Sequence, residues 1–144
     1  MTTRADVCTQ VRLWLGTPFQ HQQRVRGVAV DCVGVIIGVA RELGLVVPEF
    51  DVNSYPRVPD GRALTALCRQ HMRPIERAAM QPGDVIEVAF DRDPQHLGVL
   101  VPYLHGGFAI VHASQTVGRV VEHRLMFSNA LQFRAAYRLP GVED

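Results

Sequence analysis

The sequence has no lysine: its fifteen basic residues are all arginine, and they are spread along the chain among fourteen acidic residues. The formal net charge is therefore only +1. A chain balanced in this way has no broad field of one sign that would attract nucleic acid or an anionic membrane surface. We interpret the arginine usage as a coding bias and expect no nucleic-acid partner.

Cysteine is scarce as well. Cys8, Cys32 and Cys68 lie far apart, with no C-x-x-C spacing. Three cysteines cannot all pair, and this spacing suits neither a disulfide framework nor a zinc ribbon. The pattern is typical of a reducing compartment.

A long hydrophobic run is also missing. Residues 1–14 carry charges at Arg4, Asp6 and Arg12 and lack the apolar core of a signal peptide. The longest apolar run, residues 33–40, is too short to span a bilayer. We therefore expect synthesis in the cytoplasm without a signal peptide, and no membrane insertion.

The chain does have the composition of a packed globular domain, with 47% hydrophobic and 20% charged residues. Its 144 residues suit a single domain, 1–144. Apolar residues at helical spacing predict helices over residues 7–15, 31–43 and 60–71. Residues 48–59, with three prolines, are expected to form a loop.

The second half of the chain changes to short apolar runs separated by turn residues. This pattern predicts strands over residues 85–88, 96–101, 108–113, 119–122 and 132–139. Helices followed by strands indicate an α+β fold, with N-terminal helices packed on a C-terminal antiparallel sheet of about five strands.

Cys32 stands where the second helix is expected to begin. Asp31 is a favourable N-cap, which places Cys32 in the first helical turn. The helix dipole and the N–H groups there favour a thiolate, the form of cysteine that acts as a nucleophile. Gly34 is expected to leave space for a substrate. The alternative is that Cys32 is a small core residue, the usual place of a free cysteine.

His96 begins one predicted strand and His112 ends the next. If the connection at residues 103–107 joins the two strands in an antiparallel hairpin, the position that pairs with His96 lies near His112 or just beyond it. Such pairs project from one face of the sheet with Cβ atoms about 4.5–5.5 Å apart, although a one-residue shift would separate them. One histidine would take the thiol proton, and the other would fix the tautomer of the first by a hydrogen bond. A zinc site of these two histidines with Cys32 is the alternative.

The other four histidines are expected to contribute less. We expect His71, His105 and His123 to face solvent. His21, in the polar stretch before Cys32, either lines the cleft or belongs to a plain loop. The two remaining cysteines are expected to be thiols without function.

Five short blocks occur in the order found in the NlpC-type cell-wall cysteine peptidases of the papain-like superfamily, and the chain resembles that family from about Trp14 to Gly141. The blocks are GTPF at 16–19, VDCVG at 30–34, QPGDV at 81–85, HLGV at 96–99 and IVHA at 110–113. The resemblance implies a papain-like fold in which Cys32 is the nucleophile, His96 the base and His112 the third catalytic residue. It implies hydrolysis of amide bonds in peptidoglycan stem peptides through a thioester, with no metal or cofactor.

The chain departs from this family beside the nucleophile. Phe19 replaces a tyrosine that many members have, residues 21–23 replace Trp-Gly-Gly, and Val33 replaces a serine. Losing one oxyanion donor costs about 10²–10³ in rate. We expect the backbone N–H of Cys32, or else Gln22 or His21, to supply that donor, with Phe19, Asp31 and Val33 also on the substrate side.

Three further segments, residues 18–22, 121–123 and 138–141, resemble the branch of the family that is encoded among phage tail genes. This resemblance implies delivery to the periplasm or cell wall with a phage tail, and phage tail proteins as partners. Two alternatives remain: a structural tail-tip or tail-assembly protein with little activity, and a papain-like amidase or acyltransferase that acts on another substrate. The loop at 48–59, with Tyr55, would shape the substrate groove or bind a tail partner.

Overall fold

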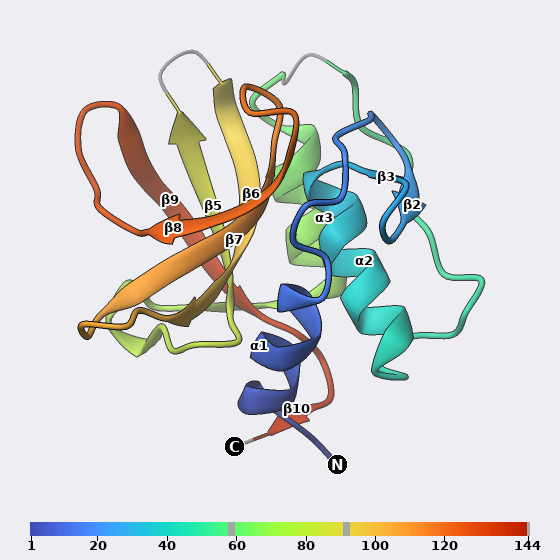
Figure 1. The fold of residues 1–144 in the computed structure, drawn as a ribbon, viewed down its shortest axis with the longest axis horizontal. Helices are drawn as coiled ribbons and strands as arrows, with labels where there is room; N and C mark the ends of the chain where they lie inside the picture. Colours follow the sequence, from blue (N-terminus) through green and yellow to red (C-terminus); the bar gives the residue numbers. More distant parts are fainter. Residues whose placement is uncertain (58–59, 91–92, 144) are drawn as a thin grey trace.

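The computed structural model describes residues 1–57, 60–90 and 93–143. Residues 58–59, at the end of the loop expected over 48–59, and residues 91–92 and 144 lie outside the described residues. Three α-helices precede the main sheet in the chain, and they lie together on one side of it (Figure 1).

Helix α1 (Arg4–Arg12) begins at a capping box. The Thr3 hydroxyl accepts a hydrogen bond from the backbone N–H of Asp6, and the Asp6 carboxylate accepts one from the N–H of Thr3. The helix therefore starts before the apolar residues that predicted it, and it ends at Arg12 rather than at residue 15.

Helix α2 (Cys32–Glu42) is the central helix, and eight of its eleven residues are buried. Gly38 allows the Trp14 ring to lie directly against it, since a Cβ atom at Gly38 would fall 2.1 Å from that ring. The Trp14 indole N–H donates to the Glu42 carboxylate at 2.7 Å. Helix α3 (Ala63–His71) starts three residues after its expected beginning, because the Asp60 carboxylate accepts the N–H groups of Arg62 and Ala63.

The main sheet has six strands in the order β4-β9-β5-β6-β7-β8, and all neighbours are antiparallel. The strands are β4 (Arg73–Ile75), β5 (Val85–Phe90), β6 (Asp93–Pro102), β7 (Phe108–Ser114), β8 (Arg119–Arg124) and β9 (Leu131–Arg138). This arrangement confirms the predicted α+β class. Within this sheet, the strand that the sequence pattern missed is β4, a three-residue edge strand that contains a proline and shows no apolar alternation.

Two small pairings lie outside this sheet. Strand β1 (Thr2–Thr3) pairs in parallel with β10 (Val142–Glu143), which brings the two ends of the chain together (Figure 1). Strand β2 (Arg24–Val25) pairs with β3 (Ala29–Val30) just before α2. None of the helices within the described ranges is long and apolar enough to cross a membrane.

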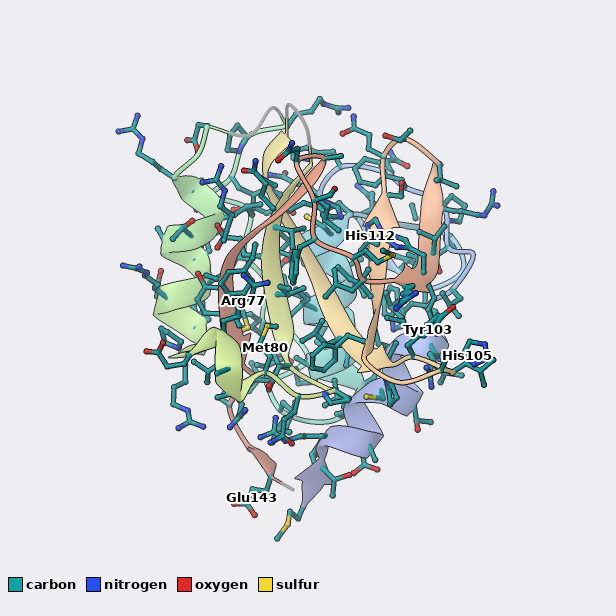
Figure 2. The ribbon with its side chains drawn as sticks, turned by 90° about the vertical axis from the view of Figure 1, so that its left-hand side faces the viewer. Arg77, Met80, Tyr103, His105, His112 and Glu143 are labelled. Atoms are coloured by element: carbon teal, nitrogen blue, oxygen red, sulfur yellow. The ribbon has the colours of Figure 1, made fainter. Side chains whose placement is uncertain are left out.

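Both faces of the main sheet are apolar. One face joins the helices in the larger core, which includes Leu97 and Val99 of β6 and Val111 of β7. The opposite face carries a smaller cluster with Leu100 and Ile110. The 3₁₀ turn η1 (Arg77–Ala79) lies beside that cluster, and Figure 2 labels its Arg77. The Arg77 guanidinium lies over the rings of Phe127 and Phe133, 4.5 and 5.0 Å from their centroids.

A buried carboxylate ties the N-terminal helix to the sheet. Asp84, directly before β5, accepts hydrogen bonds from Arg4 at 2.7 Å and from Arg138 at 3.0 Å. Its second oxygen accepts the backbone N–H of Gln81 and another Arg138 nitrogen. The QPGDV block therefore fixes the position of β5, from which β6 and its histidine follow.

Candidate active site

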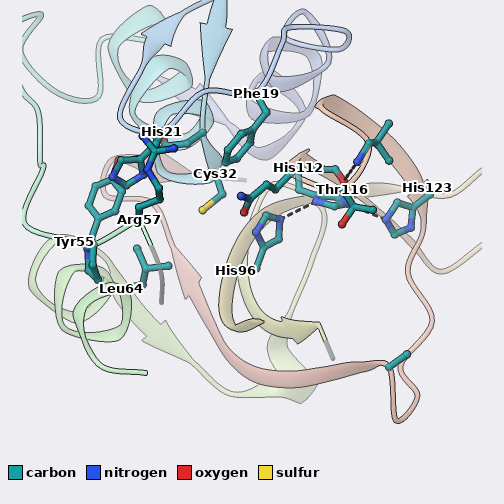
Figure 3. A pocket seen from close by; sticks show the side chains of 16 residues that line it. Phe19, His21, Cys32, Tyr55, Arg57, Leu64, His96, His112, Thr116 and His123 are labelled. Carbon is teal, nitrogen blue, oxygen red and sulfur yellow. Dashed lines mark hydrogen bonds and ion pairs between the residues drawn. The ribbon is translucent and has the colours of Figure 1, made fainter. Parts of the chain in front are cut away.

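A cleft of about 600 Å³ lies between the helical part of the molecule and the sheet (Figure 3). This volume suits a small-molecule or peptide site. One wall includes Phe19, His21, Cys32 and Tyr55, and the other comes from β6, β7, β8 and residues 114–117. The cleft thus joins the parts of the chain in which sequence analysis placed its candidate residues.

Cys32 is the first residue of α2. The Asp31 side chain caps this helix by accepting the backbone N–H of Gly34 at 2.7 Å. The Cys32 sulfur points into the cleft on the side of the His96 ring (Figure 3). Cys32 is partly exposed, whereas Cys8 and Cys68 are buried. Burial raises the pKa of both buried thiols, which keeps them protonated and unreactive.

Gly34 does not open space for a substrate, contrary to the sequence-based expectation. It is buried, and a Cβ atom there would lie 2.3 Å from the Gln23 carbonyl oxygen and 2.6 Å from the Val30 side chain. The glycine is needed so that the segment before the helix can pack against the first turn. Its effect on the site is to hold that segment close to Cys32.

Three histidines form a hydrogen-bonded row on neighbouring strands, and we call His96, His112 and His123 the histidine chain. His96 Nε2 lies 2.8 Å from His112 Nδ1, and His112 Nε2 lies 2.9 Å from His123 Nε2. The rings meet edge to face, with centroids 4.8 and 5.0 Å apart. His123 Nδ1 lies 3.0 Å from the backbone carbonyl oxygen of Arg124.

The strand register explains this row. Strands β6 and β7 pair Val99 with Val111, so His96 and His112 share a face and are offset diagonally by two residues. Strands β7 and β8 pair His112 with Val121, which places His123 on that face with the same offset. Diagonal neighbours are about 7–8 Å apart at Cα, within reach of aromatic side chains.

Burial keeps the first two rings of the histidine chain neutral at neutral pH. His96 and His112 are 6% and 4% exposed. Loss of solvation, followed by repulsion from His123, lowers the pKa of His96 to about 4. Loss of solvation, followed by repulsion from His96 and His123, lowers the pKa of His112 to about 2. A neutral imidazole beside a thiol is able to accept its proton.

Asp31 lies at the centre of a second cluster, on the helical wall, and we call Arg24, Asp31 and Tyr55 the carboxylate cluster. Asp31 accepts hydrogen bonds from Arg24 at 2.8 Å and from the Tyr55 hydroxyl at 2.7 Å. Burial, and then the hydrogen bond to Asp31, raise the pKa of Tyr55. Although burial alone would lower the pKa of Arg24, the Asp31 charge raises it. The carboxylate is therefore paired and held in place.

Of the residues expected on the substrate side, the structure brings Phe19, His21 and Asp31 to the cleft wall. His21 Nδ1 lies 3.8 Å from an Asp31 oxygen. Gln22 and Val33 are not among the described residues that line the cleft, which corrects their expected placement. The Gln22 amide donates instead to the carbonyl oxygens of Asn53 and Tyr55. The Val33 side chain is buried in the larger core.

Sequence reasoning missed two contributors to the site. His123 is exposed as expected, but it is hydrogen-bonded to His112, and the register of β7 and β8 is the signal that would have found it. The pairing of Arg24 with Asp31 depends on β2 and β3, which are two residues long and have no sequence signature. Tyr55, which was expected to shape the substrate groove or to bind a tail partner, lines the cleft. Within the described residues, no group of three or more His, Cys, Asp or Glu side chains is placed to hold a metal ion.

The sequence matches no protein-family model and no curated protein. Solved structures do share its fold. NlpC2 from Trichomonas vaginalis is 18% identical, with a TM-score of 0.69 over 96% of this chain and 48% of that chain. An N-acetylmuramoyl-L-alanine amidase from Bacteroides uniformis is 13% identical, with a TM-score of 0.58 over 95% and 98%. The peptidoglycan hydrolase RipB from Mycobacterium tuberculosis is 18% identical, with a TM-score of 0.54 over 94% and 63%.

The chain has the NlpC/P60 fold. The predicted papain-like NlpC-type architecture is thereby confirmed. At these identities the likeness concerns the fold alone, and the chain spans about half the length of the Trichomonas protein.

Proposed function

We propose that this protein is a cysteine hydrolase that cleaves an amide bond in peptidoglycan stem peptides. The observation that carries the proposal is a partly exposed thiol at a helix start that faces a buried neutral histidine across a cleft. A peptidoglycan hydrolase and an N-acetylmuramoyl-L-alanine amidase share its fold, which supports the cell wall as the substrate class. The mechanism needs no cofactor.

In this mechanism His96 takes the Cys32 proton, and the thiolate attacks the carbonyl carbon of the scissile amide. The C–N bond then breaks as His96 returns the proton to the leaving amine nitrogen. The acyl group remains on Cys32 as a thioester. Water, deprotonated by His96, attacks the thioester and releases a carboxylic acid, while the proton returns to the thiol. His112 orients the His96 ring throughout, since it is hydrogen-bonded to the nitrogen on the far side from Cys32.

The deciding experiment is mass spectrometry of stem peptides from peptidoglycan incubated with the wild type or with Cys32→Ala. We expect a new cleavage product from the wild type only. Cys8→Ala is the matched control, because it removes a buried thiol whose sulfur lies 3.7 Å from the Leu100 carbonyl oxygen and does not face the cleft. This variant should cleave stem peptides as the wild type does. Equal cleavage by Cys32→Ala would refute the proposal.

Thiol labelling separates an enzyme from a purely structural protein with this fold. We expect iodoacetamide at neutral pH to modify Cys32 at least about tenfold faster than Cys8 or Cys68, since the thiolate is the reactive form. Peptide mapping identifies the labelled residue. Equal rates at all three thiols would favour a structural role in tail assembly.

We also propose delivery to the cell wall with a phage tail. This proposal is supported by the sequence resemblance of residues 18–22, 121–123 and 138–141 to the phage tail branch of the family. Quantitative proteomics of tail particles from the source strain, purified after prophage induction, is the test. The protein should be enriched with the tail proteins, and its absence from intact particles would refute this route.

A further inference from the structure

The hydrogen bonds of the histidine chain have a direction, and one end of the chain fixes it. The Arg124 carbonyl oxygen can only accept, so the hydrogen bond at 3.0 Å requires a proton on His123 Nδ1. In a neutral imidazole the other nitrogen is then an acceptor. In the neutral form of His123, Nε2 therefore accepts, and the N–H that it accepts belongs to His112 Nε2, 2.9 Å away.

The same reasoning passes to the next ring. With a proton on Nε2, neutral His112 accepts at Nδ1, and the hydrogen bond at 2.8 Å comes from His96 Nε2–H. His96 is left with an unprotonated Nδ1. The His96 ring lies with Nε2 toward His112 and its other edge toward Cys32 (Figure 3). The nitrogen that has to receive the thiol proton is therefore the one without a proton.

We propose that His123 is a positioning residue that selects, through His112, the tautomer of His96 that can accept a proton from Cys32. The inference rests on the proposed function for its catalytic consequence, whereas the tautomer itself is a property of the folded protein. It adds a fourth side chain to the Cys–His–His set that the family resemblance implies.

The alternative direction of the chain shows why the end residue matters. If every proton shifted to the other nitrogen of its ring, His96 would carry a proton on Nδ1 and could not act as a base toward Cys32. Two histidines alone satisfy each other in either direction, because each ring has one donor and one acceptor. The pairing of His123 with a carbonyl oxygen makes the two directions unequal, since the reversed chain leaves two acceptors facing each other.

Nitrogen NMR of the histidine side chains tests this assignment without any substrate. Two-bond proton–nitrogen correlations distinguish Nδ1–H from Nε2–H imidazoles. The spectra are recorded at neutral pH in Cys32→Ala, because there no thiol proton can move onto His96. We expect the Nε2–H form for His96 and His112 and the Nδ1–H form for His123, with each ring assigned by a single His→Gln substitution.

Two substitutions at position 123 complete the test. His123→Leu removes the acceptor, and we expect His96 and His112 to become mixtures of both tautomers. His123→Gln keeps a donor for the Arg124 carbonyl and an acceptor for His112, and it should restore the wild-type tautomers. In stem-peptide cleavage, kcat should fall about tenfold in His123→Leu with KM unchanged, an effect at the lower end of the about 10–100-fold that hydrogen-bond partners of metal-ligating histidines contribute. It should recover to within about twofold in His123→Gln.

The outcomes separate the two proposals. An Nδ1–H form of His96 in the Cys32→Ala spectra, or identical tautomers and kcat in His123→Leu, would overturn the role of His123 while leaving the hydrolase intact. The expected tautomers in a protein that cleaves no stem peptide would support the directed chain and refute the proposed function instead.

Discussion

The two polar clusters that meet at Cys32 are built in opposite ways. The carboxylate cluster is charged and heavily bonded: Asp31 accepts from Arg24, Tyr55, and the backbone N–H groups of Gln22 and Gly34. In the histidine chain, the two buried rings are neutral, and the chain ends on a single backbone carbonyl. A charge with four donors resists change, whereas a row of neutral imidazoles can give and take protons. The carboxylate cluster is therefore suited to holding the start of α2 in place, and the histidine chain is suited to proton transfer.

The largest expected effect is a loss of stem-peptide cleavage when the histidine chain is changed. His96→Gln keeps a polar side chain of similar size but removes the base, so we expect stem-peptide cleavage to fall by about 10³-fold or more. The free energy of unfolding should change by less than about 1 kcal/mol, because the pair with His112 is replaced by another hydrogen bond. Turnover and urea denaturation measure the two quantities. Activity within tenfold of the wild type would mean that His96 is not the base.

A change in the carboxylate cluster should instead lower stability strongly and activity only slightly. Arg24→Met leaves the Asp31 charge without its cation in a buried setting, where loss of one partner costs about 3–5 kcal/mol. We expect a loss of about 3 kcal/mol in urea denaturation, since Tyr55 and the backbone donors remain. Activity per folded molecule should fall less than tenfold.

Arg26→Met is the matched control for that substitution. Arg26 pairs with Glu42 at 3.3 Å and is 42% exposed, so its loss should cost less than about 1 kcal/mol. If the two substitutions destabilised the protein equally, the contrast between a buried structural charge and a surface pair would be wrong.

The pH dependence of stability should reveal the neutral state of the histidine chain. The pKa of His96 lies near 4 in the folded protein, against 6.5 as the ordinary value. Between these values the unfolded chain binds a proton that the folded chain excludes, so stability is complete above pH 6.5 and falls as the pH drops toward 4. The difference amounts to about 3 kcal/mol for this ring.

Urea denaturation at pH 7.5, 6 and 4.5 measures this slope. Carboxylates also titrate in the range, so the useful quantity is the wild-type slope minus that of His96→Gln, which lacks the ring. We expect the wild type to lose more stability on acidification than the variant does. Parallel slopes would show that His96 is not held neutral by the fold.

How much the sequence could predict follows the range of the interactions involved. Asp31 and Cys32 were placed correctly because an N-cap is a local signal, readable within a few residues. It was predictable that His96 and His112 share a face, because in a tight hairpin the residue numbers determine which positions pair. The order of the six strands was not predictable, because β9 returns to pair with β5 across more than forty residues and no local sequence pattern marks that pairing.

The site residues that escaped prediction depend on longer-range contacts. Arg24 reaches Asp31 through two short strands. Tyr55 was expected at the groove or at a tail partner, but its hydrogen bond to Asp31 was not predictable, because it comes from a loop without periodicity. Gly34 was assigned to the substrate, although its neighbours are the Gln23 carbonyl and Val30. A glycine pattern in sequence shows that something approaches closely, but only the structure shows what does.

Phe19 stands between the two clusters and gives the smallest expected effect. Its ring is partly exposed on the cleft wall near Cys32 (Figure 3), and it adds no donor to either cluster. Phe19→Tyr places a hydroxyl at that wall. Because an established oxyanion donor is worth about 10²–10³ in rate, and a newly added one is less well aligned, we expect kcat for stem-peptide cleavage to rise by about tenfold.

Phe19→Leu is the control, and it should leave kcat within about threefold of the wild type, since the phenylalanine ring offers no hydrogen bond to lose. A rise in kcat with tyrosine alone would show that the wall between the clusters lacks a donor. Unchanged kcat in both variants would mean that the oxyanion is already served by the backbone at the start of α2. In that case the carboxylate cluster would contribute to catalysis only by holding the start of α2, which Asp31 caps. The histidine chain would carry out the proton transfers, so the two clusters would differ more clearly in role.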